Sequence, residues 1–123
     1  MSKDWKDGKF LLLTTFRKNG EGVPTIVWFV REGEDLLVRT GADSGKVKRI
    51  RHQAGVKLVP CGPGGRPRGA DLEAQATLLD NAEVAEEIEA KLRKKYGLQK
   101  KLVDLILRLA GKSERAYVRL VLA

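Results

Sequence analysis

Residues 9–40 read KFLLLTTFRKNGEGVPTIVWFVREGEDLLVRT and contain three apolar, β-branched runs separated by short polar turns. The runs cover residues 9–17, 23–31 and 36–40, and each turn between them contains glycine. Runs of this composition joined by glycine-containing turns of a few residues are typical of an antiparallel meander. We therefore expect three consecutive antiparallel strands, with Pro24 at a strand start or edge, where its missing N–H does no harm.

Three further strand patterns follow, at residues 56–61, 72–79 and 116–122. Together with the meander they make six short strands in mostly antiparallel order, with helical patterns inserted between them. This arrangement indicates a mainly β fold, a small barrel decorated by helices. The chain has 123 residues and no repeat, linker or low-complexity tract, so we expect a single domain over residues 1–123.

The first helical pattern follows Thr40, after a turn that contains two glycines. Asp43 or Ser44 is a plausible N-cap for it, and Val47 and Ile50 are expected to point inward at i, i+3.

Two longer amphipathic patterns cover residues 83–95 and 98–109, with Gly97 as the break between them and Gly111 as the stop after the second. Their apolar residues recur at helical spacing and are therefore predicted to face the core: Val84, Ile88 and Leu92 in the first, and Leu102, Leu105, Ile106 and Leu109 in the second.

The composition excludes several kinds of site. Cys61 is the only cysteine and His52 the only histidine, so the chain can form neither an internal disulfide nor a Cys/His metal cluster. A nucleophilic triad would depend on His52, which has no obvious orienting carboxylate nearby, and Cys61 is expected to be a small buried hydrophobe. No apolar run suggests a signal peptide or membrane span, and we expect a cytoplasmic protein without a membrane partner.

Residues 39–51, RTGADSGKVKRIR, combine a strand end, a glycine turn and a basic helix. The segment is not a Walker A loop, because only three residues separate its glycines and Val47 follows Lys46 where Ser or Thr is needed. A helix N-terminus with a lysine in its first turn still favours an anion. The alternative is an ordinary solvated basic helix face, and the formal charge of +8 suits either reading.

The order of segments over residues 14–61 resembles the pyridoxamine-phosphate-oxidase-like proteins, in particular their small F420-dependent oxidoreductase branch. The later stretches GRPRG, KKYGLQKKLVDLILRLAG and AYVRLVLA resemble one subgroup of that branch. The similarity covers nearly the whole chain in one order. It implies the flavin- or deazaflavin-binding split β-barrel fold, and a homodimer whose cofactor lies in a groove between the subunits.

Within that family the end of the third strand and the following helix hold the cofactor phosphate, and the second strand lies along the ring. The resemblance therefore implies two groups of cofactor-binding residues in this chain. Those along the ring are Thr25, Ile26, Val27 and Trp28; those at the phosphate end are Arg39, Thr40, Ser44, Lys46 and Lys48. A strand tryptophan such as Trp28 is otherwise explained by core packing or a dimer interface.

The implied function is hydride transfer between F420 and a small unsaturated or conjugated organic molecule, with FMN as the alternative cofactor. This suits a chain with no triad and no metal cluster, because such a cofactor supplies the chemistry and the protein supplies position, desolvation and electrostatics. No residue is assigned as catalytic acid or base, and no metal is expected. The alternatives are a cofactor carrier of the same fold and, from another class, a small basic nucleic-acid-binding module, although only 6% of the residues are aromatic.

Overall fold

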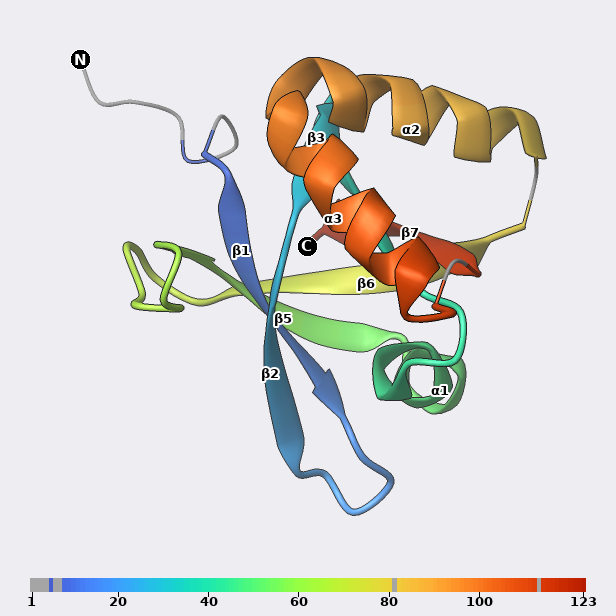
Figure 1. Cartoon of the computed structure of the whole chain (residues 1–123). Helices are drawn as coiled ribbons and strands as arrows, with labels where there is room; N and C mark the ends of the chain where they lie inside the picture. Colours follow the sequence, from blue (N-terminus) through green and yellow to red (C-terminus); the bar gives the residue numbers. More distant parts are fainter. Residues whose placement is uncertain (1–4, 6–7, 81, 113) are drawn as a thin grey trace.

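A computed structural model describes residues 5, 8–80, 82–112 and 114–123. In the described part, seven antiparallel strands form one sheet in the order β2-β1-β5-β6-β7-β4-β3 and curl into a half-barrel (Figure 1). The strands are β1 (Phe10–Phe16), β2 (Gly22–Val27), β3 (Phe29–Glu32), β4 (Asp35–Gly41), β5 (Gly55–Cys61), β6 (Leu72–Leu79) and β7 (Arg115–Leu122). Three helices complete it: α1 (Gly45–His52), α2 (Ala82–Tyr96) and α3 (Leu98–Leu109). The predicted mainly β fold with inserted helices is confirmed.

The expected second strand is divided in two at Trp28, which is why the sheet has seven strands and not six. Its first half pairs with β1 as far as Val27, and its second half pairs with β4 from Phe29 onward. At the change of partner, side chains of α2 bond the backbone of Phe29. Its N–H donates to Tyr96 Oη at 3.1 Å, and its C=O accepts from Lys95 Nζ at 2.7 Å.

The sheet separates two hydrophobic clusters. One fills the interior of the half-barrel and includes Leu11, Phe29, Leu58 and Leu120, all fully buried. The other lies between α2 and the outer side of β3 and β4, and consists of Val30, Leu37, Ile88, Leu92 and Tyr96. β4 contributes alternate side chains to both clusters because successive side chains of a strand point to opposite faces.

The first two helices agree with the sequence patterns. In α1, Val47 and Ile50 are buried, and Ser44 is the N-cap residue, although its side chain makes no capping hydrogen bond. In α2, Ile88 and Leu92 are fully buried, and Val84 packs against the same cluster.

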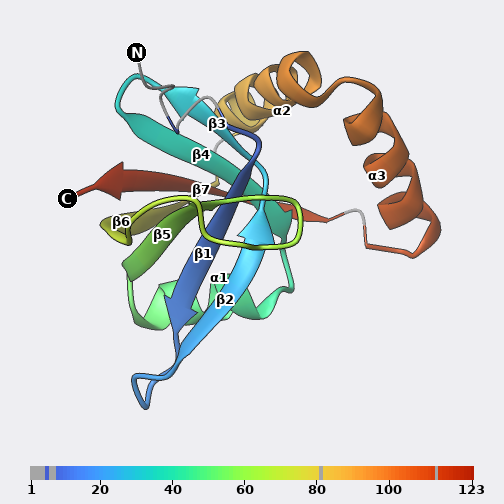
Figure 2. The same cartoon turned by 90° about the vertical axis from the view of Figure 1, so that its left-hand side faces the viewer.

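The third helix contradicts its prediction. The residues expected to face the core are instead among the most exposed large hydrophobics of the described chain: Leu102 at 59%, Leu105 at 43%, Ile106 at 57% and Leu109 at 77%. The buried residue of α3 is Lys100. Figure 2 shows α3 standing away from the sheet at one edge of the molecule, whereas α2 lies beside β3.

Both ends of α3 lie next to the glycines that were predicted to bound it. Gly97 adopts a φ of +56° at the junction with α2, and Gly111 adopts a φ of +73° after the last turn. The N–H of Gly111 bonds Arg108 C=O and that of Lys112 bonds Leu107 C=O, which is the Schellman arrangement expected at a glycine stop.

Candidate functional site

A cavity of about 400 Å³ lies between the sheet, the start of α1 and the inner side of α3. Six of the nine predicted site residues contribute to its wall. The lining residues are Ile26, Val27, Trp28, Arg39, Thr40, Gly41, Lys46, Leu92, Val103, Leu107, Lys112, Glu114 and Arg115. A second cavity of about 620 Å³ shares Gly41, Lys112 and Glu114 with the first, and adds Ser44. The two adjoin through these shared residues and form one groove, with an apolar end at Ile26, Val27 and Trp28 and an end at the start of α1 where Lys46 lies near Asp43 and Glu114.

The apolar end is built where β2 gives way to β3. Ile26, Val27 and Trp28 are consecutive there, and all three reach the cavity because the extended chain is interrupted at Trp28. The indole of Trp28 stacks on the phenol ring of Tyr96, with 4.2 Å between centroids and 7° between planes. Tyr96 Oη in turn donates to Lys9 C=O at 2.7 Å. Trp28 therefore stacks on a tyrosine ring that is held in place by a hydrogen bond to the backbone.

The basic end is the first turn of α1. Ser44 Oγ lies 3.3 Å from Thr40 Oγ1 and makes no capping bond, which leaves N–H groups of the first turn without a side-chain acceptor. Lys46 is half-buried beside the cavity and has no ion pair or hydrogen bond to a described residue. Burial and the nearby charge of Arg49 lower the pKa of Lys46.

Arg49 adds a second cation close to Lys46, although it lines neither cavity. Its Nε donates to Thr15 Oγ1 at 2.6 Å, and a Cβ built on Gly45 would come within 2.6 Å of its Nη1, so the guanidinium lies against the first turn of the helix. Two cations at a helix N-terminus favour a bound anion, and Asp43 and Glu114 are the carboxylates of the adjoining cavity walls. These residues therefore fit the phosphate end of a flavin or deazaflavin.

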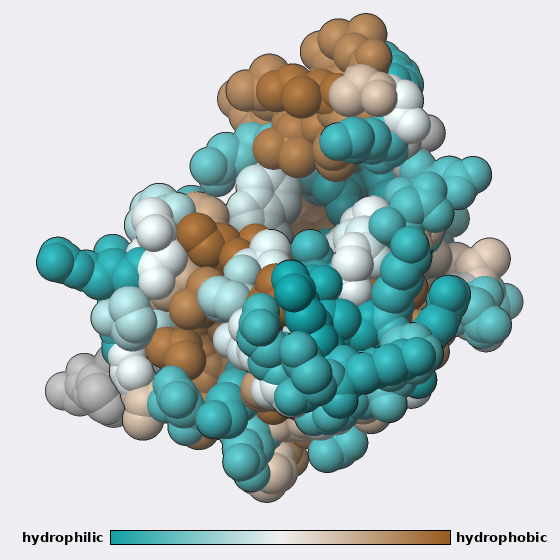
Figure 3. Space-filling model, turned by 90° about the horizontal axis from the view of Figure 1, so that it is seen from below, coloured by the Kyte–Doolittle hydropathy of each residue, from teal (hydrophilic) through white to brown (hydrophobic). Residues whose placement is uncertain are grey.

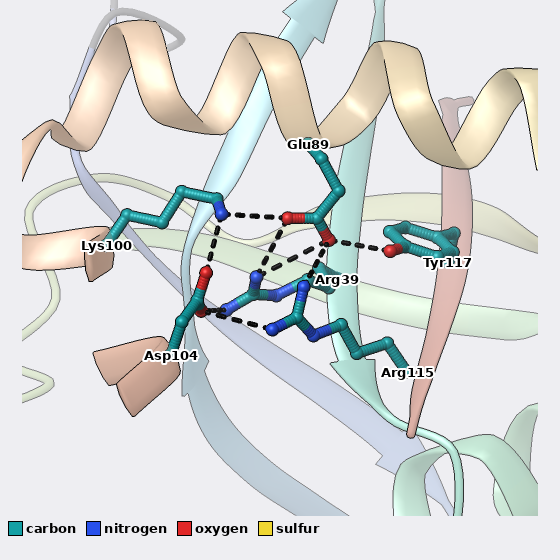
Figure 4. A network of polar contacts seen from close by, with 6 residues as sticks. All are labelled: Arg39, Glu89, Lys100, Asp104, Arg115 and Tyr117. Carbon is teal, nitrogen blue, oxygen red and sulfur yellow. Dashed lines mark hydrogen bonds and ion pairs between the residues drawn. The ribbon is translucent and has the colours of Figure 1, made fainter. Parts of the chain in front are cut away.

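Arg39, predicted at the phosphate end, has a different set of contacts. Its Nη1 donates to Glu89 Oε1 at 3.0 Å, and its Nη2 donates to Asp104 Oδ1 at 2.7 Å (Figure 4). Its side chain is only 8% exposed. The guanidinium is therefore held by carboxylates of α2 and α3, and borders the cavity while its terminal nitrogens bond protein groups.

Arg39 belongs to a network that ties α3 to the rest of the molecule. Lys100 Nζ lies 2.9 Å from Glu89 Oε1 and 2.6 Å from Asp104 Oδ2, and Arg115 reaches both carboxylates from β7. Tyr117 Oη donates to Glu89 Oε2 at 2.6 Å. Figure 4 shows the two acidic side chains pointing toward one another with the cations around them.

The pKa shifts agree with a network that stays charged. Burial alone would raise the pKa of Asp104, but hydrogen bonds from Arg39 and Lys100 bring it down to about 2. The pKa of Glu89 is also lowered, since bonds from Tyr117 and Lys100 outweigh its burial. Burial and the bond to Glu89 raise the pKa of Tyr117 to about 12.

Sequence reasoning missed this network because it assigned the leucine stripe of α3 to the core. The competing stripe of Lys100, Val103, Asp104 and Leu107 has the same helical spacing and is the one that faces the cavity and the sheet. One signal was available: Asp104 is the only acidic residue between positions 90 and 112, a stretch rich in lysine and arginine. A lone carboxylate in such a stretch is a candidate for pairing.

Two predicted residues, Thr25 and Lys48, do not contribute to either cavity wall. Thr25 lies opposite Leu13 in the pairing of β2 with β1. Lys48 is exposed on α1 and lies two residues after Lys46, which places the two side chains on nearly opposite sides of the helix.

The burial predicted for the single cysteine is confirmed. Cys61 is buried, and burial raises the pKa of its thiol although Arg68 opposes this. The described residues contain no group of His, Cys, Asp and Glu that could hold a metal ion. None of the helices they form is long and apolar enough to cross a bilayer.

The family model described as Pyridoxamine 5'-phosphate oxidase matches residues 3–120. No curated protein sequence matches the chain. Among solved structures, the heme storage protein HutZ from Vibrio cholerae aligns with a TM-score of 0.72 at 15% identity, over 97% of this chain and 85% of that chain. A conserved hypothetical protein from Mycobacterium tuberculosis gives a TM-score of 0.70 at 19% identity, over 95% and 74%.

A structure named F420 reductase aligns with a TM-score of 0.61 at 19% identity, over 94% of this chain and 86% of that chain. At such identities the likeness concerns the fold alone. The half-barrel sheet and the family model together define the class of protein, the split barrels of the pyridoxamine-phosphate-oxidase type. The chain belongs to the pyridoxamine 5'-phosphate oxidase family, because the family model covers nearly all of it.

Proposed function

We propose that the chain is an oxidoreductase that binds F420, with FMN as the alternative cofactor, and transfers a hydride to or from a small unsaturated or conjugated organic molecule. The observation that carries the proposal is Lys46, which is half-buried and unpaired among the described residues at the start of α1. The opposite end of the same groove is apolar and contains Trp28. A phosphate and a flat ring are the two parts that such a groove accommodates.

Each part of the site has a role in this proposal. Lys46, Arg49 and the N–H groups of α1 would hold the phosphate, with Thr40 and Ser44 beside them. Ile26, Val27 and Trp28 would cover the ring and exclude water from it. When bound, the cofactor supplies the hydride chemistry. Arg39 would act indirectly, because its ion pairs with Glu89 and Asp104 hold α3 as the far wall of the cavity.

We further propose a homodimer in which a second copy closes the groove. Ile26, at the apolar end, is 39% exposed in the isolated chain. An exposed apolar side chain at the mouth of a ring-binding groove is consistent with cover from another subunit.

Haem carriage is a less suitable function for this groove. Haem iron is held in proteins by an axial His, Cys, Met or Tyr. None of the described residues that line the two cavities is of these types. The likeness to a heme storage protein concerns the fold.

The test is titration of the apoprotein with F420 and with FMN, followed by fluorescence at one fixed salt concentration. Replacement of Lys46 by alanine removes a charge-assisted contact of about 1.5–3 kcal/mol, so affinity should fall roughly tenfold or more. Lys48→Ala is the matched control: it removes the same charge from the same helix outside the cavity, and should cost well under about 1 kcal/mol.

Urea unfolding should show that both variants remain folded, since surface substitutions rarely change stability by more than about 0.5 kcal/mol. Equal and small losses of affinity in the two variants would show that α1 is an ordinary solvated helix. The proposed phosphate site would then be wrong.

A further inference from the structure

The outward side of α3 is a continuous apolar face. We call it the leucine face, and it consists of Leu98, Leu102, Leu105, Ile106 and Leu109, which are between 43% and 80% exposed. Their spacing of i, i+4, i+7, i+8 and i+11 places them along one side of a helix. In Figure 3 a hydrophobic lobe projects from the body of the molecule, with a hollow between the two.

The contacts on the opposite side of α3 explain why the leucine face is exposed. The opposite side of α3 carries Lys100 and Asp104, whose side chains are 7% and 21% exposed and belong to the ion-pair network with Arg39 and Glu89. A rotation of α3 that buried the leucines would bring these charges into water and take from Arg39 the Asp104 carboxylate, one of its two partners. Breaking such a buried pair is strongly unfavourable. The leucine face therefore stays exposed unless another molecule covers it.

The surroundings of the leucine face are basic. We call these residues the basic rim: Lys101 and Arg108 on α3, and Arg93 and Lys94 in the last turn of α2, just before Leu98. All four are exposed, and none forms an ion pair with a described residue. The single acidic residue of this stretch, Asp104, is already paired. The rim therefore presents unbalanced positive charge around an apolar strip.

We propose that the leucine face and the basic rim bind together to the surface of an anionic lipid bilayer. An amphipathic helix with leucines on one side and lysine or arginine beside them lies in the headgroup region, with its apolar side in the acyl boundary. The 12 residues of α3 span about 18 Å. That is short of the roughly 30 Å needed to cross a bilayer, so the helix lies on the membrane.

The positive charge of the basic rim favours a lipid surface over a second copy of the chain or a nucleic acid. A second copy docked through the same face would bring one basic rim against the other, since such an interface is isologous. Nucleic acid would match the rim but would leave the leucines in water. An anionic bilayer neutralises the rim and buries the leucines at the same time. The sequence predicted no membrane partner because it contains no apolar run long enough to span a bilayer, and a helix that lies on the surface needs no such run.

The test is co-sedimentation of the full chain with vesicles at about 0.15 M salt, close to the physiological value. Vesicles of phosphatidylcholine alone are compared with vesicles that also contain phosphatidylglycerol. We expect binding to the mixed vesicles and little binding to the neutral ones, and the binding should weaken as salt is raised. The double variant Leu102→Gln with Ile106→Gln should reduce the partition coefficient at least about tenfold, because it removes buried apolar area.

A charge-matched pair of variants tests the rim. Each basic residue near an anionic surface contributes about fivefold to partitioning. Lys101→Gln with Arg108→Gln should therefore reduce binding by about 25-fold. Lys48→Gln with Lys57→Gln removes the same net charge from exposed positions on α1 and β5 and should have a much smaller effect. An equal loss in both pairs would show unspecific attraction and overturn the proposal.

Light scattering and cofactor titration separate this proposal from the proposed function. The leucine variant should keep the mass of the wild-type protein and its cofactor affinity while it loses vesicle binding. If the same variant changes a dimer into a monomer, the face is an interface between copies and the lipid proposal is wrong. Absence of vesicle binding by the wild-type protein also overturns it, whatever the cofactor titration shows.

Discussion

Helices α2 and α3 follow one another with only Gly97 between them, and both are amphipathic, yet they bury opposite kinds of side chain. α2 places Ile88 and Leu92 against the sheet, both fully buried. α3 turns Leu102 and Ile106 to the outside and holds Lys100 and Asp104 inside. The two helices contact each other and share one ion-pair network through Glu89. One helix is therefore held by hydrophobic packing and the other mainly by charge.

The difference shows that an apolar stripe does not determine by itself which side of a helix is buried. In α2 the stripe meets apolar side chains of β3 and β4, so burial and pattern agree. In α3 the competing stripe contains the carboxylate that Arg39 and Lys100 need. A buried cation without a partner is costly, so the charged stripe is the one turned inward. The leucines are then available for the surface role inferred above.

The largest expected effect is the difference between two Ile→Ala substitutions, one in each helix. Ile88→Ala removes a fully buried side chain of α2 and should lower the free energy of unfolding by about 2–5 kcal/mol. Ile106→Ala, at a position that is 57% exposed on α3, should change it by less than about 0.5 kcal/mol. Urea unfolding of both variants measures the difference. Similar losses would mean that the outer side of α3 is packed in solution.

The second prediction concerns the charged side of α3. The pKa of Asp104 is about 2 in the folded chain, below its ordinary value of 3.8. That shift corresponds to about 2 kcal/mol of stability at neutral pH, which Asp104→Asn should remove. Glu87→Gln, at an exposed position on α2, is the matched control and should have little effect.

The pH dependence follows from the sign of the shift. Because the folded-state pKa is depressed, the contribution of Asp104 is complete above about pH 4 and disappears as the pH falls toward about 2. Wild-type protein and Asp104→Asn should therefore converge in stability over this range when unfolding is followed at a series of pH values. A difference that stays constant down to pH 2 would place the effect of the substitution outside the ion pairs.

The smallest expected effect lies at the junction of the two helices. Gly97 has a φ of +56°, and a Cβ there would meet no atom within 4 Å. Gly97→Ala should therefore cost about 1 kcal/mol from backbone strain alone. Gly64→Ala, also in open space but without a positive φ, is the control and should be neutral or slightly stabilising. Thermal unfolding compares the two, and a neutral Gly97→Ala would mean that the junction can relax.

The sequence by itself determined the elements whose signals are local. Alternating apolar runs and glycine turns predicted the six extended segments, and glycines marked both ends of α3, because these features depend on neighbouring residues. The order of segments also indicated the family, which the match over residues 3–120 confirms. Six predicted site residues, from Ile26 to Lys46, do meet at one cavity. The assigned cofactor roles stay a prediction.

Only the tertiary structure decided the features that depend on distant partners. The strand break at Trp28 arises because β2 pairs with β1 and β3 pairs with β4, while Tyr96 and Lys95 bond the backbone of Phe29 from α2. The orientation of α3 was decided by Arg39, which lies 65 positions before Asp104 in the chain. A helical period shows which residues share a side, but the free energy of burying each side depends on what the rest of the fold places opposite it.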